Sequence, residues 1–276
     1  MQENKILRYP PKEFADSISG MYAPFEKYVA NVVPLMLEHA WTMKMEKGTT
    51  TLEALMNCAW IGRLITLDTR VIDVVKQTEI PGWIPLQHQL IKRLDQCSGE
   101  EQLPGMTHDC MHLLYPVLKE RFQDNYHFPS KEFHCWWYTI HDDNTHLALH
   151  LVNAYQPGSP FDQLHHFLTT MLKAVEQAVK TYPAIRVVSC GSWLNGLAKF
   201  QYIWPDSFRE HVRILNATGG FGPGAWGQYM TMDGGFNEAK AAQLRQTGIH
   251  PYPLTEARST VEEVRAHLHK IIALTP

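Results

Sequence analysis

The sequence predicts an α+β protein with a helical N-terminal domain and a mixed α/β C-terminal domain. Two observations lead to this fold class. Between about residues 12 and 126, apolar residues recur at helical spacing. After Pro129 the chain becomes dense in aromatic and β-branched residues, and strand-like runs then alternate with a long amphipathic segment. We therefore predict two domains, at residues 1–130 and 131–276.

Four helices are expected in the first half, over about residues 24–40, 51–74, 86–97 and 107–124. Pro34 lies inside the first and is expected to kink or divide it. Thr49–Thr51 supplies N-cap candidates for the second. Pro104-Gly105 is expected to form a turn before the fourth.

A β-hairpin is predicted at the start of the second half. Phe133–Ile140 and Thr145–Asn153 have strand composition, and His141–Asn144 forms the polar turn between them.

A crossover follows the hairpin. Ser159 and Pro160 suit the N-cap and first position of a long helix, which Pro183 ends. Ile185–Cys190 then reads as a buried strand, and this helix has the length that a parallel connection needs.

The remaining elements are expected as a short helix at 197–203, a strand at 211–216, a glycine-rich loop at 219–224, a strand from Trp226, a helix at 236–246 and a terminal helix after the capping-box pattern Ser259–Glu262.

Composition narrows the class of partner. Hydrophobic residues make up 45% of the 276 residues and the net charge is −3, so we expect a globular protein with no nucleic-acid partner. The polar start at Met1 and the lack of an apolar run of roughly 18 residues predict a cytoplasmic protein with no membrane partner. The five scattered cysteines form no C-x-x-C pair, which argues against a disulfide framework or a thiolate zinc site.

The order of motifs in the second half resembles a known family. A strand ends in Leu149-His150, and one helix later a strand runs into Cys190-Gly-Ser-Trp-Leu194. Asp206-Ser-Phe208 and a closing segment from Ala257 to Leu268 follow. This order resembles bacterial acyltransferase-like proteins that join a helical N-terminal domain to a GNAT-like C-terminal domain.

The resemblance covers about residues 133–272. It implies a GNAT-like mixed sheet and suggests acyl transfer. The Gln/Arg-x-x-Gly-x-Gly/Ala pyrophosphate loop of GNAT enzymes is missing, and the glycines at 219–224 come late in the chain. The cofactor is therefore left open, with acyl-CoA as one option.

Asp142, Asp143, His146 and His150 are the densest group of titratable residues. On a strand, His146 and His150 share one face, where they could move a proton, bind a metal or simply lie half-exposed. A metal would need a third ligand that the sequence does not identify, so we predict none. We assign His150 as general base and His146 to substrate binding.

Cys190 and Ser192 are the candidate nucleophiles, at the end of the crossover strand where ligands gather in open α/β sheets. The alternative is a buried structural cysteine. Asn153, Trp193 and Asn195 are predicted to line the substrate site.

The glycine-rich loop leads into Trp226, Gln228 and Tyr229, which are also predicted to contact substrate. The alternative is a surface loop or lid.

These residues predict an enzyme that acts on a small polar metabolite, with acyl transfer as the leading reaction. One alternative is a lyase or hydrolase that uses the same site without CoA. The other is a non-catalytic binding or assembly partner, and homo-oligomers are compatible with each.

Overall fold

The computed structural model describes residues 7–9, 23–65, 83–125, 133–155, 157–216 and 223–276. The chain divides into two compact units. The sheet unit comprises residues 1–19, 127–215 and 254–276, and the helical unit comprises 20–126 and 216–253. Helices and one mixed sheet build the described chain, which confirms the α+β class. The predicted single boundary at 130/131 differs from this division, because residues 216–253 group with the helical unit.

Six strands form one sheet in the described part of the sheet unit, in the order β1-β2-β3-β4-β6-β5. Their bounds are Leu7–Tyr9 (β1), Trp136–His141 (β2), His146–Leu151 (β3), Val187–Ser192 (β4), Arg213–Asn216 (β5) and Leu254–Thr260 (β6). β2 is antiparallel to both of its neighbours, β1 and β3, whereas β3 and β4 are parallel and β4 and β6 are antiparallel.

The predicted hairpin and crossover are both confirmed. β2 and β3 pair around a short turn, and the chain then passes through a 3-10 turn at Pro160–Gln163 into α6 (Leu164–Thr181) before entering β4. Ser159 caps this segment in a capping box with Asp162. The crossover brings β4 alongside β3 in parallel, as its length predicts.

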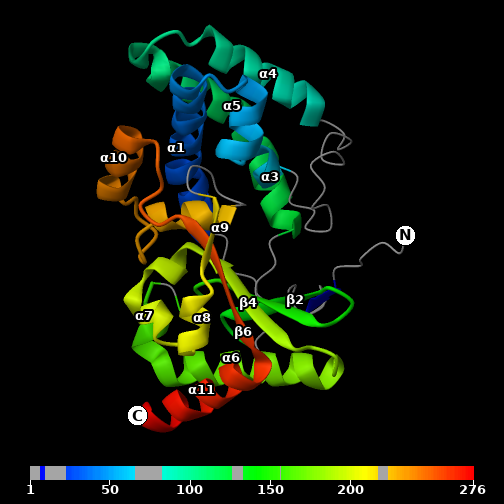
Figure 1. Ribbon diagram of the computed structural model, residues 1–276. Helices are drawn as coiled ribbons and strands as arrows, with labels where there is room; N and C mark the ends of the chain where they lie inside the picture. The colour runs from blue at the N-terminus through cyan, green and yellow to red at the C-terminus, as the bar shows by residue number, and fades with distance from the viewer. Residues whose placement is uncertain (1–6, 10–22, 66–82, 126–132, 156, 217–222) are drawn as a thin grey trace. The chain divides into compact units, whose positions relative to one another are not determined.

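One face of the sheet packs against α6 and α11 (Val261–Leu274), as Figure 1 shows. Trp136 on β2 is fully buried there, stacks on Phe167 of α6 at 5.0 Å between ring centroids, and donates its indole N–H to the Phe167 carbonyl oxygen. Leu147 and Leu149 of β3 and Cys190 of β4 share this face and are buried. We call it the core face.

The short helices of the sheet unit follow β4. They are a 3-10 turn at Trp193–Gly196, α7 (Ala198–Gln201) and α8 (Asp206–Glu210). β6 was not predicted as a strand. The capping box before α11 is formed by Thr260 and Glu263, one residue later than the predicted pattern, because β6 extends to Thr260.

The helical unit contains α1 (Ala23–Lys47), α2 (Thr51–Glu53), a π-helical turn at Ala54–Cys58, α3 (Ile61–Ile65), α4 (Trp83–Gln96), a 3-10 turn at Glu100–Gln102, α5 (Leu103–Asn125), α9 (Pro223–Trp226), a 3-10 turn at Gly227–Tyr229 and α10 (Glu238–Thr247). α1, α3, α4 and α5 supply most of its buried core.

The structure differs from three predictions in this unit. α1 continues through Pro34, so the helix is not divided there, and Val33 and Leu35 on either side of the proline are buried in the core. Pro104-Gly105 lies in the first turn of α5, where a proline lacks only an N–H that has no helical partner. The expected strand at Trp226 is helical. The end of the second predicted helix, Val74, and the glycines at 219–222 lie outside the described residues.

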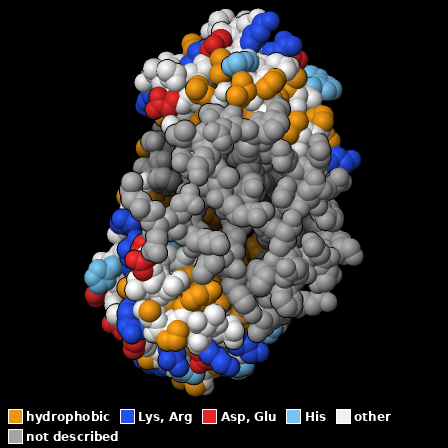
Figure 2. Space-filling model, turned by 90° about the vertical axis from the view of Figure 1, so that its right-hand side faces the viewer, with side chains coloured by type: hydrophobic (Ala, Val, Ile, Leu, Met, Phe, Trp, Pro, Cys, Tyr) orange, Lys and Arg blue, Asp and Glu red, His pale blue; other side chains and the backbone are white. Residues whose placement is uncertain are grey.

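No helix of the described ranges is long and apolar enough to cross a bilayer. On the face drawn in Figure 2, the acidic and basic side chains of described residues are interspersed.

Candidate functional site

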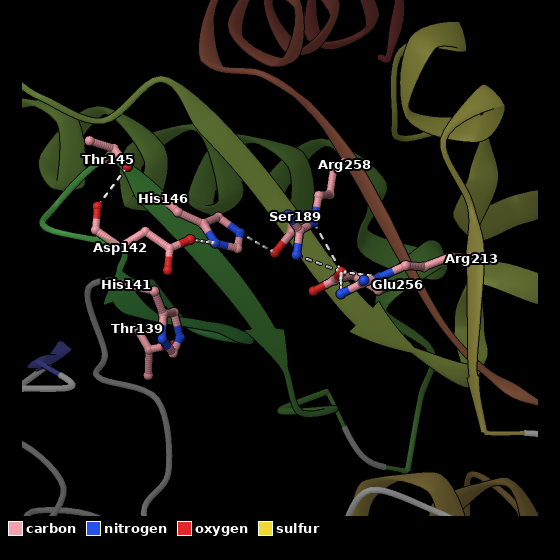
Figure 3. Close-up of polar contacts among 9 residues, drawn as sticks. All are labelled: Thr139, His141, Asp142, Thr145, His146, Ser189, Arg213, Glu256 and Arg258. Atoms are coloured by element: carbon pink, nitrogen blue, oxygen red, sulfur yellow. Dashed lines mark hydrogen bonds and ion pairs between the residues drawn. The ribbon is translucent and has the colours of Figure 1, made fainter. Parts of the chain in front are cut away.

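The second face of the sheet carries a row of polar side chains contributed by four strands, β2, β3, β4 and β6. The register places His146 and His150 of β3 on the same side as Thr139 of β2, because side chains alternate along each strand. Ser189 of β4 and Arg258 of β6 lie on this side too. We call it the polar face, and Figure 3 shows the contacts around His146, Ser189 and Arg258.

Asp142, His146 and Ser189 form a hydrogen-bonded relay on the polar face. The Nδ1 of His146 lies 3.3 Å from Oδ2 of Asp142, and its Nε2 lies 2.7 Å from Oγ of Ser189. An ionised carboxylate can only accept a hydrogen bond, so Nδ1 of His146 carries a hydrogen atom and donates the hydrogen bond to Asp142. Nε2 is then free to accept the hydroxyl proton of Ser189.

The β2–β3 turn positions the Asp142 carboxylate. Asp142, Asp143 and Asn144 have φ of 51°, 53° and 67°, a left-handed conformation that Asp and Asn adopt more readily than other non-glycine residues. The Thr145 hydroxyl donates to the backbone carbonyl of Asp142 at 2.7 Å, which closes the turn. The side chain of Asp142 therefore returns toward His146, the first residue of β3.

The surroundings of His146 favour its neutral form. Burial lowers its pKa below 6.5, and the positive charge of Arg258 lowers it further. The hydrogen bond and charge of Asp142 act in the opposite direction, but the net shift is downward. His146 is therefore mainly neutral at pH 7, which is the state that can accept a proton.

An arginine–glutamate cluster lies next to Ser189. Arg258 is the cross-strand partner of Ser189, and both Arg258 and Arg213 of β5 bond to the same oxygen, Oε2 of Glu256. In Figure 3 this cluster lies on the opposite side of Ser189 from His146.

A second polar group surrounds His150. The Thr139 hydroxyl lies 2.9 Å from Nε2 of His150 and 2.8 Å from Nε2 of His141. The His150 ring stacks on Trp137 at 3.9 Å between centroids, and both side chains are half-buried. His150 therefore shares a face with His146, as predicted, but has its own partners.

The structure does not bring His150 together with Ser192 or Cys190. Leu149, a core-face residue, is the register partner of Cys190, so the side chain of Cys190 is also on the core face. Ser192, two residues later, is on the same face as Cys190, whereas His150 is on the polar face. Cys190 is buried, and this burial raises the pKa of its thiol to about 12. A buried thiol that stays protonated is a poor nucleophile, so the prediction that Cys190 is a nucleophile activated by His150 is corrected.

Ser192, Asn195 and Asn153 make local structural bonds. The Ser192 hydroxyl caps the turn that follows β4 by accepting from the Leu194 N–H. Asn195 donates its amide to the carbonyl oxygens of Cys190 and Thr255, which ties β4 to β6. Asn153 holds the turn before Ser159, and the half-buried Trp193 begins the 3-10 turn.

Trp226, Gln228 and Tyr229 belong to the helical unit and are buried there. The Gln228 side chain donates to the Tyr252 carbonyl oxygen and accepts from its N–H, which makes it a brace between two segments. The Tyr229 hydroxyl lies 2.7 Å from Nδ1 of His250. The relay in the sheet unit is built without these three residues.

Sequence reasoning missed four residues of the site, namely Ser189, Arg213, Glu256 and Arg258. Ser189 could have been found, since it is the polar residue that alternates with Val188 and Cys190 in a strand parallel to β3. Arg258 and Glu256 required β6, which was not predicted. In the described ranges no group of three or more His, Cys, Asp or Glu side chains is arranged to hold a metal ion.

Compared with protein-family models, with curated proteins and with solved structures, the chain matches none.

Proposed function

We propose that the sheet unit is an acyl-transferring enzyme of the hydrolase type, with Ser189 as nucleophile and His146 as its general base. The observation that supports this is the unbroken sequence of contacts from Asp142 through His146 to Ser189, at 3.3 and 2.7 Å. A nucleophile, a base and a third group that orients the base are the parts that acyl transfer through a serine needs.

The proposed reaction has two steps. The Ser189 Oγ attacks the carbonyl carbon of an ester or thioester while its proton passes to Nε2 of His146. The tetrahedral intermediate then collapses, and the leaving group departs with that proton. Water gives a proton to the same imidazole and attacks the carbonyl carbon of the acyl-serine. The bond from that carbon to Oγ then breaks, the imidazolium returns the proton to Oγ, and the carboxylic acid is released. Asp142 stabilises the imidazolium that forms in each step.

The burial of Ser189 sets a condition on this mechanism. Ser189 as a whole residue is 1% exposed, so a substrate reaches Oγ only after neighbouring side chains move aside. Small acyl groups therefore suit the site better than bulky ones, in line with a small polar metabolite as substrate.

The direct experiment is covalent labelling with a small fluorophosphonate, read by intact mass and peptide mapping. We expect one adduct, on Ser189, and none in Ser189→Ala. Ser98→Ala removes an exposed hydroxyl of the helical unit and serves as the matched control. Hydrolysis of 4-nitrophenyl butyrate is measured in parallel. Equal labelling or hydrolysis by Ser189→Ala and the parent protein would rule the proposal out, as would a parent that neither labels nor hydrolyses the ester.

A second candidate is direct acyl transfer from acyl-CoA to a small polar acceptor, with His150 as general base on a GNAT-like sheet. Two observations favour it: the mixed sheet in which a hairpin is followed by a parallel strand, and the half-buried imidazole held between Trp137 and Thr139. Acetyl-CoA should then raise the melting temperature, since it would bind only the folded protein. No shift at millimolar acetyl-CoA would argue against it. The lyase, the assembly partner and the homo-oligomer stay predictions.

A further inference from the structure

Two guanidinium groups on the polar face share a single carboxylate. Arg213 bonds to Oε2 of Glu256 through Nε at 2.8 Å and Nη2 at 2.7 Å, and Arg258 bonds to the same oxygen through the same two nitrogens at 2.9 Å each. Two positive charges thus face one negative charge, so the cluster carries a net charge of about +1 (+2 from the arginines and −1 from Glu256).

The cluster also keeps hydrogen-bond donors that Glu256 does not use. A guanidinium has five N–H donors, and within the described chain the bonds of both groups end on one oxygen. The side chains of Arg213 and Arg258 are 62% and 43% exposed, whereas that of Glu256 is 15% exposed. The remaining N–H groups are therefore open to an acceptor from solution, while the carboxylate that fixes the two arginines is largely covered.

The position of the cluster links it to the relay. Arg258 faces Ser189 directly across the β4–β6 pair, where opposed Cβ atoms lie about 5 Å apart. The arginine–glutamate cluster therefore lies beside Ser189, on the side away from His146 (Figure 3). An anionic group held there and a carbonyl at Oγ of Ser189 fit the two ends of one short acyl chain.

We infer that Arg213 and Arg258 form an oxyanion-binding site that selects acyl substrates bearing a carboxylate or phosphate group. The selection of substrates rests on the proposed function, whereas the binding of an anion does not. Paired guanidiniums suit such groups because their planar N–H donors match two oxygens at once. A cluster that only pins the edge strand β5 to β6 would show no dependence on anions.

Anion binding is tested first and without catalysis, by calorimetric titration of the full chain with succinate and, separately, with inorganic phosphate. We expect binding of at least one, weakened about tenfold in Arg258→Gln, the lower end for loss of a charge-assisted hydrogen bond. Arg265→Gln on α11 removes the same charge from the helix-covered side and should bind as the parent does. Absence of binding, or equal binding by Arg258→Gln, would overturn the inference. The two anions together distinguish carboxylate from phosphate selection.

Selectivity is tested with two esters of equal acyl length, mono-4-nitrophenyl succinate and 4-nitrophenyl butyrate. The ratio of their kcat/KM values should fall about tenfold in Arg258→Gln. It should rise in Glu256→Gln, because removal of the shared carboxylate raises the local charge from +1 to +2. A ratio that moves in neither variant contradicts the selection of anionic substrates. If Ser189→Ala hydrolyses both esters as the parent does, the proposed function fails, and the anion site is decided by calorimetry alone.

Discussion

The Nε2 of His146 lies 2.7 Å from the Oγ of Ser189, although 43 residues separate them in the chain. The sheet register creates this contact. Ala148 is the partner of Ser189 in the parallel β3–β4 pair, so His146, two residues earlier on the same face, lies diagonal to Ser189 and its ring spans the gap. The α6 crossover fixes this register, and the turn at Asp142 then supplies the third member.

Replacing Asp142 with Asn should slow the acylation of Ser189 by about 10²–10⁴-fold. The carboxamide can offer an N–H to Nδ1, which favours the tautomer whose Nε2 carries the proton and cannot act as base. Asp143→Asn is the matched control, since Asp143 is also exposed in the same turn with a left-handed φ of 53°. The measurement is the rate of fluorophosphonate labelling at pH 7. Equal rates for the two variants would show that Asp142 only shapes the turn.

The hairpin and crossover could be predicted because their signals are local. Alternation of apolar and polar residues identifies β3, and Ser159-Pro160 marks the start of the segment that leads into α6. β6 could not be predicted this way. It reads Leu-Thr-Glu-Ala-Arg-Ser-Thr, mostly polar, and it becomes a strand because β4 and β5 pair on either side of it.

The site was predicted less well than the fold for the same physical reason. A strand end was expected to gather His150 and Ser192, but a shift of one residue along a strand moves a side chain to the opposite face. The serine that bonds to a β3 histidine is Ser189, which lies on the same face as His146 and contacts that residue, whereas His150 bonds to Thr139. Only the register, which depends on the pairing of strands distant in sequence, determines this.

The cysteines should be unreactive in the folded protein. All five are buried free thiols, and burial raises the pKa of Cys110, Cys135 and Cys190 to about 12. Titration with a thiol-specific disulfide reagent at pH 7.5 should therefore proceed slowly in the native state and reach five equivalents in guanidinium chloride. Cys190→Ala should retain labelling of Ser189. Loss of that labelling in a folded Cys190→Ala protein would restore Cys190 as a candidate nucleophile.

The stability of the helical unit should fall in mild acid because of His250. His250 as a whole residue is 3% exposed, and burial, with a smaller contribution from the charge of His39, lowers its pKa from 6.5 to about 3. The unfolded chain therefore binds a proton between pH 6.5 and 3 that the folded chain does not. The free energy of unfolding is unaffected above pH 6.5 and declines below it, by about 2 kcal/mol at pH 5.

Urea unfolding at pH 7 and pH 5 measures this effect as the difference between the parent and His250→Asn. The variant should lose less stability on acidification. His88→Asn, on the exposed side of α4, should behave as the parent does. If the parent and His250→Asn lose stability equally between the two pH values, His250 is protonated or hydrated in the native state.

The comparison of His146→Gln with His150→Gln distinguishes the two candidate bases. Both residues lie on β3 with side chains on the polar face, so the two substitutions disturb the strand to a similar degree. If Ser189 is the nucleophile, His146→Gln should lower kcat for 4-nitrophenyl butyrate by about 10²–10⁴-fold, the usual contribution of a general base. His150→Gln should act mainly through the loss of its stacking on Trp137 and its bond to Thr139, so its effect should be smaller and fall on KM.

The pH profile of kcat/KM gives a second way to identify the base. Because burial and Arg258 lower the pKa of His146, the acid limb of kcat/KM should lie below pH 6.5 and disappear in His146→Gln. The reverse pattern, with kcat lost in His150→Gln and retained in His146→Gln, would transfer the role of base to His150 and favour direct acyl transfer over the serine mechanism.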